Sequence, residues 1–153
     1  MDLDQIFERE QAKIGQTLGV SPWHLLDQDR ISAFAEVTGD RQFIHVDQVN
    51  ARKTAFGGTI AHGFLTLSLI ATLALETIAP LPGQRLALNY GFEKVRFLSP
   101  VPSGSHVRAK FVLQAVARRG SEQLLHTLAV EMALKGSAKP ALVATWLSLA
   151  VFS

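Results

Sequence analysis

The stretch from Phe64 to Ala79, FLTLSLIATLALETIA, is the feature that most restricts how this chain can fold. It is apolar on most faces of a helix, and such a helix is surrounded by other structure rather than lying on a surface. It is shorter than the roughly 20 residues that a membrane span needs, and it carries Glu76 near its end. Pro80 and Pro82 end it. We therefore predict a buried core helix over 64–79 and no membrane partner.

The segments after Gly83 have the pattern of strands. Apolar and polar residues partly alternate in four runs, which proline, glycine or serine turns separate: RLALNYGFEKVRF, HVRAKFVLQAVA, LLHTLAVEMAL and ALVATWLSLAVF. The order is helices and loops first, then about four antiparallel strands. A curved sheet around one long buried helix is an α+β layout.

The segments before the buried helix contain two further predicted helices. Residues 3–14 form a short amphipathic pattern, and Val20 to Leu26 is a first strand or an extended arm that Pro22 restricts. Asp27 is a suitable N-cap for a helix through Thr38. Gly39 then stands where a helix C-terminal glycine is expected.

Composition excludes several classes of function. The chain has 153 residues, 48% apolar and 18% charged, which predicts one compact domain over 1–153. It has no cysteine, so disulfides, thiolate metal sites and cysteine nucleophiles are excluded. The formal net charge is +2 with no basic run, which argues against nucleic acid as a partner. The first residues do not resemble a signal peptide, so we predict a cytoplasmic location.

The stretch TGDRQFIHVD places Asp40 and His45 five residues apart in the loop after the second helix. Three interpretations compete. The pair lies in an ordinary polar loop, or it belongs to a metal site together with Asp47 and His62. Alternatively, the carboxylate and the imidazole form a general acid/base pair that binds and deprotonates a water.

A second loop, AFGGTIAHG, leads into the apolar helix and is rich in glycine. Gly57, Gly58 and Gly63 leave backbone exposed near the helix start, where free N–H groups favour a phosphate or a developing oxyanion. The loop matches neither a P-loop nor a dinucleotide-binding fingerprint, and a simple turn explains the glycines equally well. Ser68, inside the helix, is predicted to be a small core residue that bonds to its own helix rather than a nucleophile.

Together, FAEVTGDRQFIHVD and GGTIAHGFLTLSLI resemble the MaoC-like, (R)-specific enoyl-CoA hydratases. The resemblance is closest to the single-hot-dog branch that includes nodulation protein N-like sequences, and it extends over about residues 20 to 150 through LALNYGFEKVRFLSPVPSGSHVRA and GSAKPALVA. It implies an α+β hot-dog fold, with about five antiparallel strands wrapped around one long buried helix. It also implies a hydro-lyase that needs no metal or redox cofactor.

The resemblance assigns roles to residues of this chain. Asp40 and His45 correspond to the family's catalytic pair. Four positions are implied as oxyanion or active-site support: Gly63, Ser68, Gln42 and His62. Many members have Asn-Pro where this chain has Gln42 and Phe43, so the amide is kept on a longer arm while the rigid proline is lost.

The predicted reaction is the addition of water to a trans-2-enoyl-CoA, or the reverse dehydration, in a homodimer. An acyl-CoA thioesterase is the alternative enzyme, and a non-catalytic acyl-thioester-binding subunit is the alternative outside enzymology. The homodimer follows from edge strands that need cover, since hot-dog proteins commonly pair edge to edge. Scattered basic residues are predicted to bind the CoA phosphates: Lys94, Arg96, Lys135 and Lys139.

Overall fold

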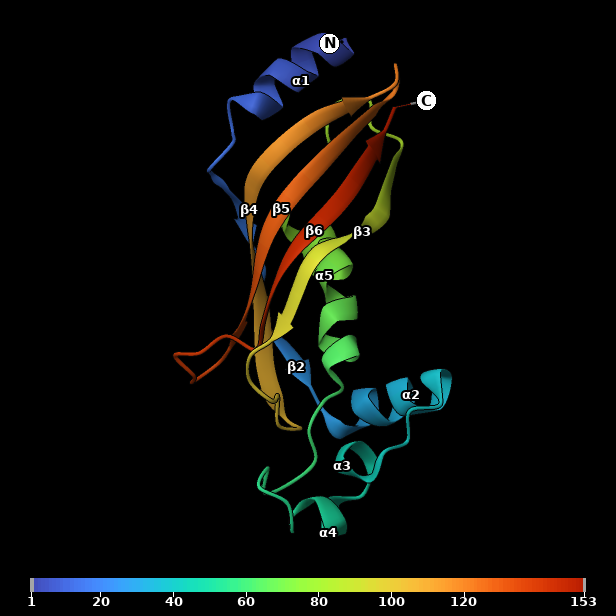
Figure 1. The fold of residues 1–153 in the computed structure, drawn as a ribbon, viewed down its shortest axis with the longest axis vertical. Helices are drawn as coiled ribbons and strands as arrows, with labels where there is room; N and C mark the ends of the chain where they lie inside the picture. Colours follow the sequence, from blue (N-terminus) through green and yellow to red (C-terminus); the bar gives the residue numbers. More distant parts are fainter. Residues whose placement is uncertain (1, 153) are drawn as a thin grey trace.

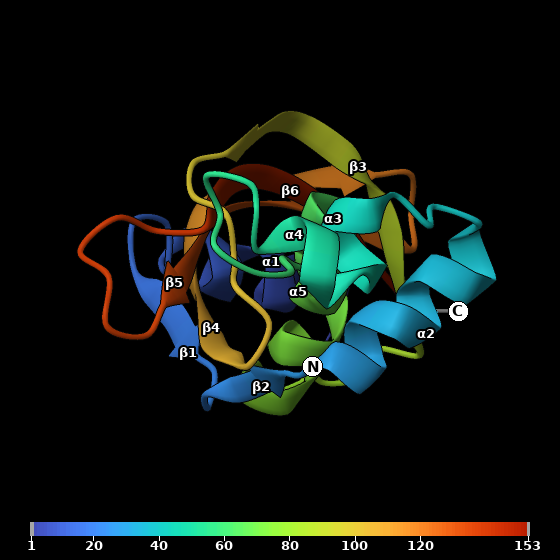
Figure 2. The ribbon, with the colours of Figure 1, turned by 90° about the horizontal axis from the view of Figure 1, so that it is seen from below.

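The helix α5 (Gly63–Thr77) lies inside a curved antiparallel sheet, and the other elements are arranged around these two parts (Figures 1 and 2). The structure is a computed structural model that describes residues 2–152. The predicted core helix is confirmed, although it ends at Thr77 rather than at residue 79. Ile78 has extended backbone (φ −108°, ψ 115°), and Ala79 is held out of the helical region because it precedes a proline. Over residues 2–152, no helix combines the length and the apolar character that a membrane crossing requires.

Six strands form the sheet, against the five expected, and every pairing is antiparallel. The strands are β1 (Thr17–Val20), β2 (His24–Leu26), β3 (Leu86–Phe97), β4 (Ser105–Arg119), β5 (Gln123–Leu134) and β6 (Leu142–Val151). Their order is β1-β4-β5-β6-β3, and β2 also pairs with β4. Of the two alternatives for Val20 to Leu26, a strand or an extended arm, one continuous strand is wrong, because Ser21, Pro22 and Trp23 separate β1 from β2. The four predicted later strands are confirmed.

The remaining helices lie at the two ends of the sheet (Figure 1). They are α1 (Leu3–Gln11), α2 (Gln28–Thr38), α3 (Phe43–Val46) and α4 (Gln48–Ala51). α2 matches the prediction, with Asp27 accepting from the N–H of Arg30 and Gly39 in the left-handed region at φ 78°. α1 ends three residues early, because the following turn directs the N–H of Gly15 to the carbonyl of Leu113 on β4.

The main core lies between one face of α5 and the concave face of the sheet. Buried α5 residues such as Leu69 and Leu73 pack in one cluster with Phe111, Met132 and Trp146 of the sheet. Burying each such side chain contributes roughly 1.5–3 kcal/mol.

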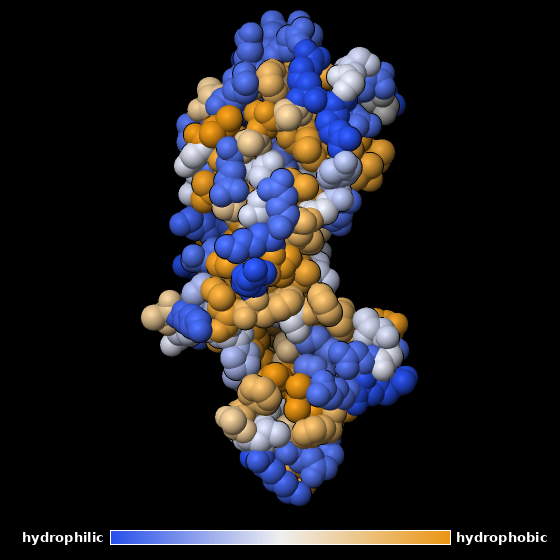
Figure 3. Space-filling view, in the orientation of Figure 1, coloured by the Kyte–Doolittle hydropathy of each residue, from blue (hydrophilic) through white to orange (hydrophobic). Residues whose placement is uncertain are grey.

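The other face of α5 is open, so the prediction of a helix wrapped on most sides is only half right. Phe64 is 67% exposed and Leu75 is 75% exposed. Apolar side chains of the neighbouring edge strand β3 are exposed as well: Leu86, Leu88, Tyr90, Phe92 and Phe97. Figure 3 shows apolar surface across the middle of this side, where β3 crosses α5.

Truncation of Leu73 to alanine tests the position of the core. Leu73 is fully buried in the middle of α5, so Leu73→Ala should lower the free energy of unfolding by about 2–5 kcal/mol. Val37, which is 82% exposed on α2, is the matched control, and Val37→Ala should change that free energy by less than about 0.5 kcal/mol. Urea denaturation measures both. Equal effects from the two variants would contradict the assigned core.

Candidate active site

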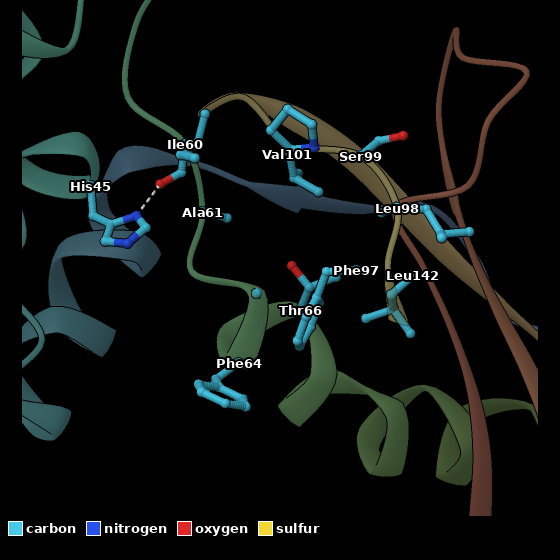
Figure 4. A pocket seen from close by; sticks show the side chains of 13 residues that line it. His45, Ile60, Ala61, Phe64, Thr66, Phe97, Leu98, Ser99, Val101 and Leu142 are labelled. Atoms are coloured by element: carbon cyan, nitrogen blue, oxygen red, sulfur yellow. Dashed lines mark hydrogen bonds between the residues drawn. The ribbon is translucent and has the colours of Figure 1, made fainter. Parts of the chain in front are cut away.

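Two loops that are distant in sequence are hydrogen-bonded to each other beside the start of α5. The N–H of Ile60 donates to the carbonyl of Ile44 at 3.0 Å, and Nδ1 of His45 donates to the carbonyl of Ile60 at 2.7 Å. The next residue, Ala61, donates its N–H to the carbonyl of Val101 at 2.8 Å, which attaches the second loop to the segment before β4. Figure 4 shows the His45 ring directed at Ile60. The predicted acid/base loop and the glycine-rich loop therefore form one site.

His45 lies on the short helix α3, within a stretch that the sequence pattern had assigned to a loop. Its side chain is only 6% exposed. A backbone carbonyl can only accept, so the Nδ1 atom that faces Ile60 carries the proton in the neutral ring. Nε2 then keeps its lone pair and is free to accept a proton or a metal ion.

The His62 ring stacks against the His45 ring, with centroids 3.8 Å apart and planes at 23°. Nε2 of His62 donates to the backbone carbonyl of Asp40 at 2.9 Å, and the Phe34 ring packs at 4.9 Å from the His62 ring. His62 therefore ties the Asp40 backbone to the His45 ring. Its Nδ1 atom is buried and has no hydrogen-bond partner among the described residues.

Asp40 is the exposed member of the group. One carboxylate oxygen of Asp40 and one ring nitrogen from each of His45 and His62 all lie within 4.8 Å of one another. The Asp40 carboxylate also accepts the N–H of Gln42 at 3.4 Å. The neighbouring cation Arg41 does not neutralise it, because both bonds of its guanidinium go to Glu36 at 2.7 Å.

These three side chains could also hold a divalent cation, since carboxylate oxygen and imidazole nitrogen are its usual donors. Nε2 of His45 and Nδ1 of His62 are the ring atoms left for such an ion, because each ring's other nitrogen donates to a carbonyl. Asp47, the fourth ligand considered from the sequence, does not join them. It caps α4 through the N–H and side chain of Asn50, and these hydrogen bonds hold the pKa of its carboxyl below the usual range.

The start of α5 forms one wall of a pocket of about 350 Å³ that His45 and Gly63 both line. Neither Gly63 nor Phe64 has an acceptor for its N–H among residues 2–152. A Cβ atom on Gly63 would lie 2.9 Å from the Phe97 ring, so only glycine lets the chain pass this close. Free N–H groups at a helix N-terminus attract negative charge. Asp40 is not among the lining residues.

Gln28 is a structural residue of the site that sequence reasoning missed. Its Nε2 atom donates to the carbonyl of His45 at 2.8 Å and to Ser32 at 3.2 Å, while its Oε1 atom accepts from Thr59 at 2.6 Å. It thus fastens α2, α3 and the second loop to one another. A glutamine at the start of a helix has no local pattern that distinguishes it from a solvated residue.

Three residues that were predicted near the site lie apart from its centre. Ser68 bonds to the carbonyl of Leu65 at 2.7 Å as expected, but it is exposed on the open face of α5 rather than in the core. Gly57 and Gly58 belong to the turn after α4, so only Gly63 stands at the helix start. The role of Ser68 in supporting the active site stays a prediction.

The four predicted CoA-binding residues do not form one cluster. Lys94 and Arg96 share one face of β3, as predicted, since they pair with Thr145 and Val143 of β6 without a register shift between them. Lys135, by contrast, lies 5.8 Å above the Trp23 ring, beside β2 at the other edge of the sheet. Lys139 is exposed in the turn between β5 and β6. A role of these residues in CoA binding therefore stays a prediction.

A sheet curled around one helix defines a hot-dog protein, and a carboxylate and two imidazoles lie together near the helix start. Residues 9–150 match the MaoC like domain family. The chain belongs to this MaoC-like dehydratase family and is a hydro-lyase.

Two relatives and one solved structure show how close this similarity is. The chain is 44% identical over 142 residues to nodulation protein N of Rhizobium leguminosarum bv. viciae, covering 92% of this chain and 88% of the relative. It is also 44% identical over 133 residues to 3-hydroxyacyl-thioester dehydratase Z of Mycobacterium tuberculosis, with 87% of each chain covered. An (R)-hydratase from A. caviae superposes with a TM-score of 0.69 at 26% identity, covering 88% of this chain and 94% of the other.

The role of Gln28 can be tested by removing its amide. Gln28→Ala leaves the Thr59 hydroxyl and the His45 carbonyl without these partners, so the free energy of unfolding should fall by about 1–3 kcal/mol. Gln48→Ala on α4 is the matched control, because Gln48 is exposed and its side chain makes no hydrogen bond to another described residue. Urea denaturation measures both variants. If Gln28→Ala were as stable as Gln48→Ala, Gln28 would not fasten the loops.

Proposed function

We propose that this protein is an (R)-specific enoyl-CoA hydratase, which adds water to a trans-2-enoyl-CoA or removes it from the (R)-3-hydroxyacyl-CoA. The observation that carries the proposal is the position of His45, which links two groups. Its ring lies in one cluster with the Asp40 carboxylate, and it lines the same pocket as Gly63, whose N–H has no acceptor among residues 2–152. The dehydratase and hydratase names of the relatives support the same reaction class.

Hydration requires one proton to leave a water and one proton to reach the substrate. The water oxygen bonds to C3 of the enoyl group while the C2–C3 double bond breaks, and C2 then takes a proton. Nε2 of His45 can accept the proton of the water, because the Ile60 carbonyl fixes the hydrogen on Nδ1. The Asp40 carboxylate can orient the same water, and His45 then passes the accepted proton to C2. Alternatively, Asp40 accepts the proton of the water and returns it to C2. The assignment of base and acid to the two residues is left open.

Negative charge develops on the thioester oxygen during this addition. Gly63 lines the same pocket as His45 and its N–H has no acceptor among residues 2–152, so a thioester carbonyl beside Gly63 could accept that N–H at the positive end of the α5 dipole. Groups already fixed before the reaction stabilise such charge most effectively. The close packing of Phe97 on Gly63 supports this fixed arrangement.

We further propose that the reaction needs neither a metal nor a redox cofactor. Hydration is redox-neutral, and residues of the chain can supply both the proton transfers and the oxyanion donor. Because the Asp40, His45 and His62 side chains could hold a divalent ion, dialysis against a chelator decides the matter. The crotonyl-CoA hydration rate should be unchanged after dialysis, and a loss that zinc or iron restores would contradict this part of the proposal. A cytoplasmic location also stays a prediction.

Substitution of the acid/base pair tests the proposed function. Asp40→Asn and His45→Gln should each slow crotonyl-CoA hydration by about 10²–10⁴-fold, because each removes a positioned proton-transfer group. The loss of the enoyl-thioester absorbance measures the rate. Asp47→Asn in the same region and His24→Gln beside Glu76 are matched controls, since neither side chain belongs to the group. Both controls should retain near-wild-type rates.

Two outcomes would redirect the proposal. Release of free CoA from saturated acyl-CoA, detected with a thiol reagent, would identify a thioesterase instead. Binding of crotonyl-CoA without any turnover would identify a non-catalytic acyl-thioester-binding subunit. Near-wild-type hydration by a folded Asp40→Asn or His45→Gln variant would remove that residue from the mechanism.

The open face of α5 and β3 supports the predicted homodimer. β3 is a twelve-residue strand at the end of the sheet, and several of its apolar side chains are exposed. A long apolar edge strand is a strong site for pairing with another chain. We propose that two copies join through β3, so that the partner covers the exposed face of α5 and holds part of the acyl chain.

A charge placed on β3 should separate the proposed dimer. Phe92 is 39% exposed on β3, and Phe92→Lys places an ammonium group in the apolar contact. Light scattering at micromolar concentration should then report the monomer mass instead of the dimer mass. Val37→Lys, at an exposed apolar position on α2, is the control that should stay dimeric. A wild-type protein that is monomeric at this concentration would refute the proposal.

A further inference from the structure

A second and larger pocket lies at the opposite end of α5 from the proposed active site. Its volume is about 540 Å³, within the roughly 300–1,000 Å³ of small-molecule sites. The C-terminal half of α5 and the concave faces of β3, β5 and β6 form its walls, and α1 contributes Glu10. Most of the lining is apolar, including Ala71, Ile78, Leu128 and Trp146.

A row of polar side chains crosses this otherwise apolar wall. Asn89 of β3 pairs in register with Ser148 of β6, and Ser148 pairs in register with His126 of β5. All three line the pocket, whereas the residues beside them on the concave face, such as Leu128 and Trp146, are apolar. Asn89, on the edge strand β3, is exposed, Ser148 is half-buried, and His126 is buried.

Two members of this polar row have no hydrogen-bond partner among residues 2–152. The Asn89 amide and the Ser148 hydroxyl make no hydrogen bond to another described residue. His126 differs, because its Nε2 atom lies 3.4 Å from the carboxylate of Glu10. A few polar groups that converge in an apolar pocket are typical of a site that recognises one polar group on an apolar ligand.

One face of α5 connects this pocket with the proposed active site. Phe64, Ser68, Ala71 and Leu75 follow the spacing of a single helix face. Phe64 lines the active-site pocket, and Ala71 and Leu75 line the second pocket, about 10 Å further along the helix at roughly 1.5 Å per residue. Of the four residues on this face, Ser68 is the one between the two pockets, and its side chain is small and exposed. A long acyl chain that starts beside His45 can therefore follow α5 into the second pocket.

We infer that the protein acts on long-chain acyl thioesters that carry a hydroxyl or oxo group near the far end of the hydrocarbon chain. This inference rests on the proposed function and names its substrate class. The Asn89 amide and the Ser148 hydroxyl bind the distal oxygen, and the alkyl carbons pack against the apolar wall. The carboxylate of Glu10 beside the row is already paired with Lys13 at 2.6 Å and faces His126, so the row offers hydrogen-bonding groups without an unpaired charge, which suits a neutral distal group. Asn89 and Ser148 are specificity residues, remote from the reacting atoms.

The kinetic test compares trans-2-decenoyl-CoA with the same thioester bearing a hydroxyl on its penultimate carbon. One or two hydrogen bonds to the added hydroxyl should raise kcat/KM by about three- to tenfold over the unsubstituted thioester. Ser148→Ala and Asn89→Ala should bring the ratio of the two kcat/KM values, hydroxylated over unsubstituted thioester, close to one. Thr127→Ala, on the convex face of β5, removes a hydroxyl outside the pocket and should keep the ratio. A third thioester with a terminal carboxylate should be the poorest substrate.

Trp146 gives a second readout that does not depend on turnover. The chain has two tryptophans, so Trp23→Phe leaves Trp146, in the pocket wall, as the only indole reporter. The fluorescence of Trp146 should change on titration with decanoic acid that bears a hydroxyl on its penultimate carbon. The apparent affinity of the protein for this hydroxy acid should fall with Ser148→Ala.

A ratio near one in the wild type, or a ratio that both alanine variants preserve, would overturn the inference. Binding of the hydroxy acid at Trp146 without any kinetic preference for the hydroxylated thioester would also overturn the inference. The pocket would then bind a lipid that is not the substrate. Absence of crotonyl-CoA hydration would instead count against the proposed function, because that short chain does not reach the second pocket.

Discussion

The hydrogen bond from Nδ1 of His45 to the carbonyl of Ile60 is the contact on which the site depends. It fixes the imidazole tautomer, and with the Ile60 N–H to Ile44 carbonyl bond it joins the α3 segment to the loop before α5. The His62 ring stacks on the His45 ring and donates to the Asp40 backbone, so the catalytic candidates move as one unit with the helix start. Gln28 adds a second attachment from α2. Without these bonds, the loop that carries Asp40 and His45 would be independent of the loop that carries Ile60, His62 and Gly63.

The sequence was sufficient for the parts of the fold that local chemistry determines. Hydropathy located α5, the Asp27 and Gly39 caps delimited α2, and alternation located the four long strands. The sequence also singled out Asp40, His45 and Gly63, although the roles assigned to them rested on the resemblance to the MaoC-like hydratases. The approach of the two loops depends on hydrogen bonds between residues about fifteen positions apart, one from the His45 side chain and one between backbone groups, which no local pattern encodes.

Tertiary contacts account for what the sequence did not predict. A helix buried within its own chain and a helix covered by a second chain have the same apolar pattern. The open face of α5 therefore could not be predicted from the sequence. The same holds for Gln28, whose importance depends on three distant partners. β1 and β2 were merged because a single proline in an extended segment does not show whether the strand continues beyond it. Lys94 and Lys135 were grouped by charge, yet the sheet order sends them to different edges.

The two ends of α5 have different chemistry, and different parts of the chain complete them. At the N-terminal end, the segments between α2 and α5 add Asp40 and His45 beside free N–H groups, which suits proton transfer. At the C-terminal end, α1 adds Glu10 to the concave face of the sheet. Burial would raise the pKa of Glu10, but hydrogen bonds from His126 and Lys13, together with their charges, outweigh it and hold that pKa below its ordinary value.

Glu10 is therefore ionised at neutral pH. Because its pKa is lower in the folded protein than in the unfolded chain, its contacts stabilise the fold fully at pH values above the unfolded-state pKa. This stabilisation is lost as the pH falls through the folded-state pKa. The contact fastens α1 over the second pocket and positions His126 at the end of the polar row. A buried carboxylate is costly where only packing is needed, because an apolar side chain of similar size fills such a position at least as well. Its presence beside Asn89 and Ser148 is consistent with a pocket wall that selects a polar group, rather than with a core that only has to be filled.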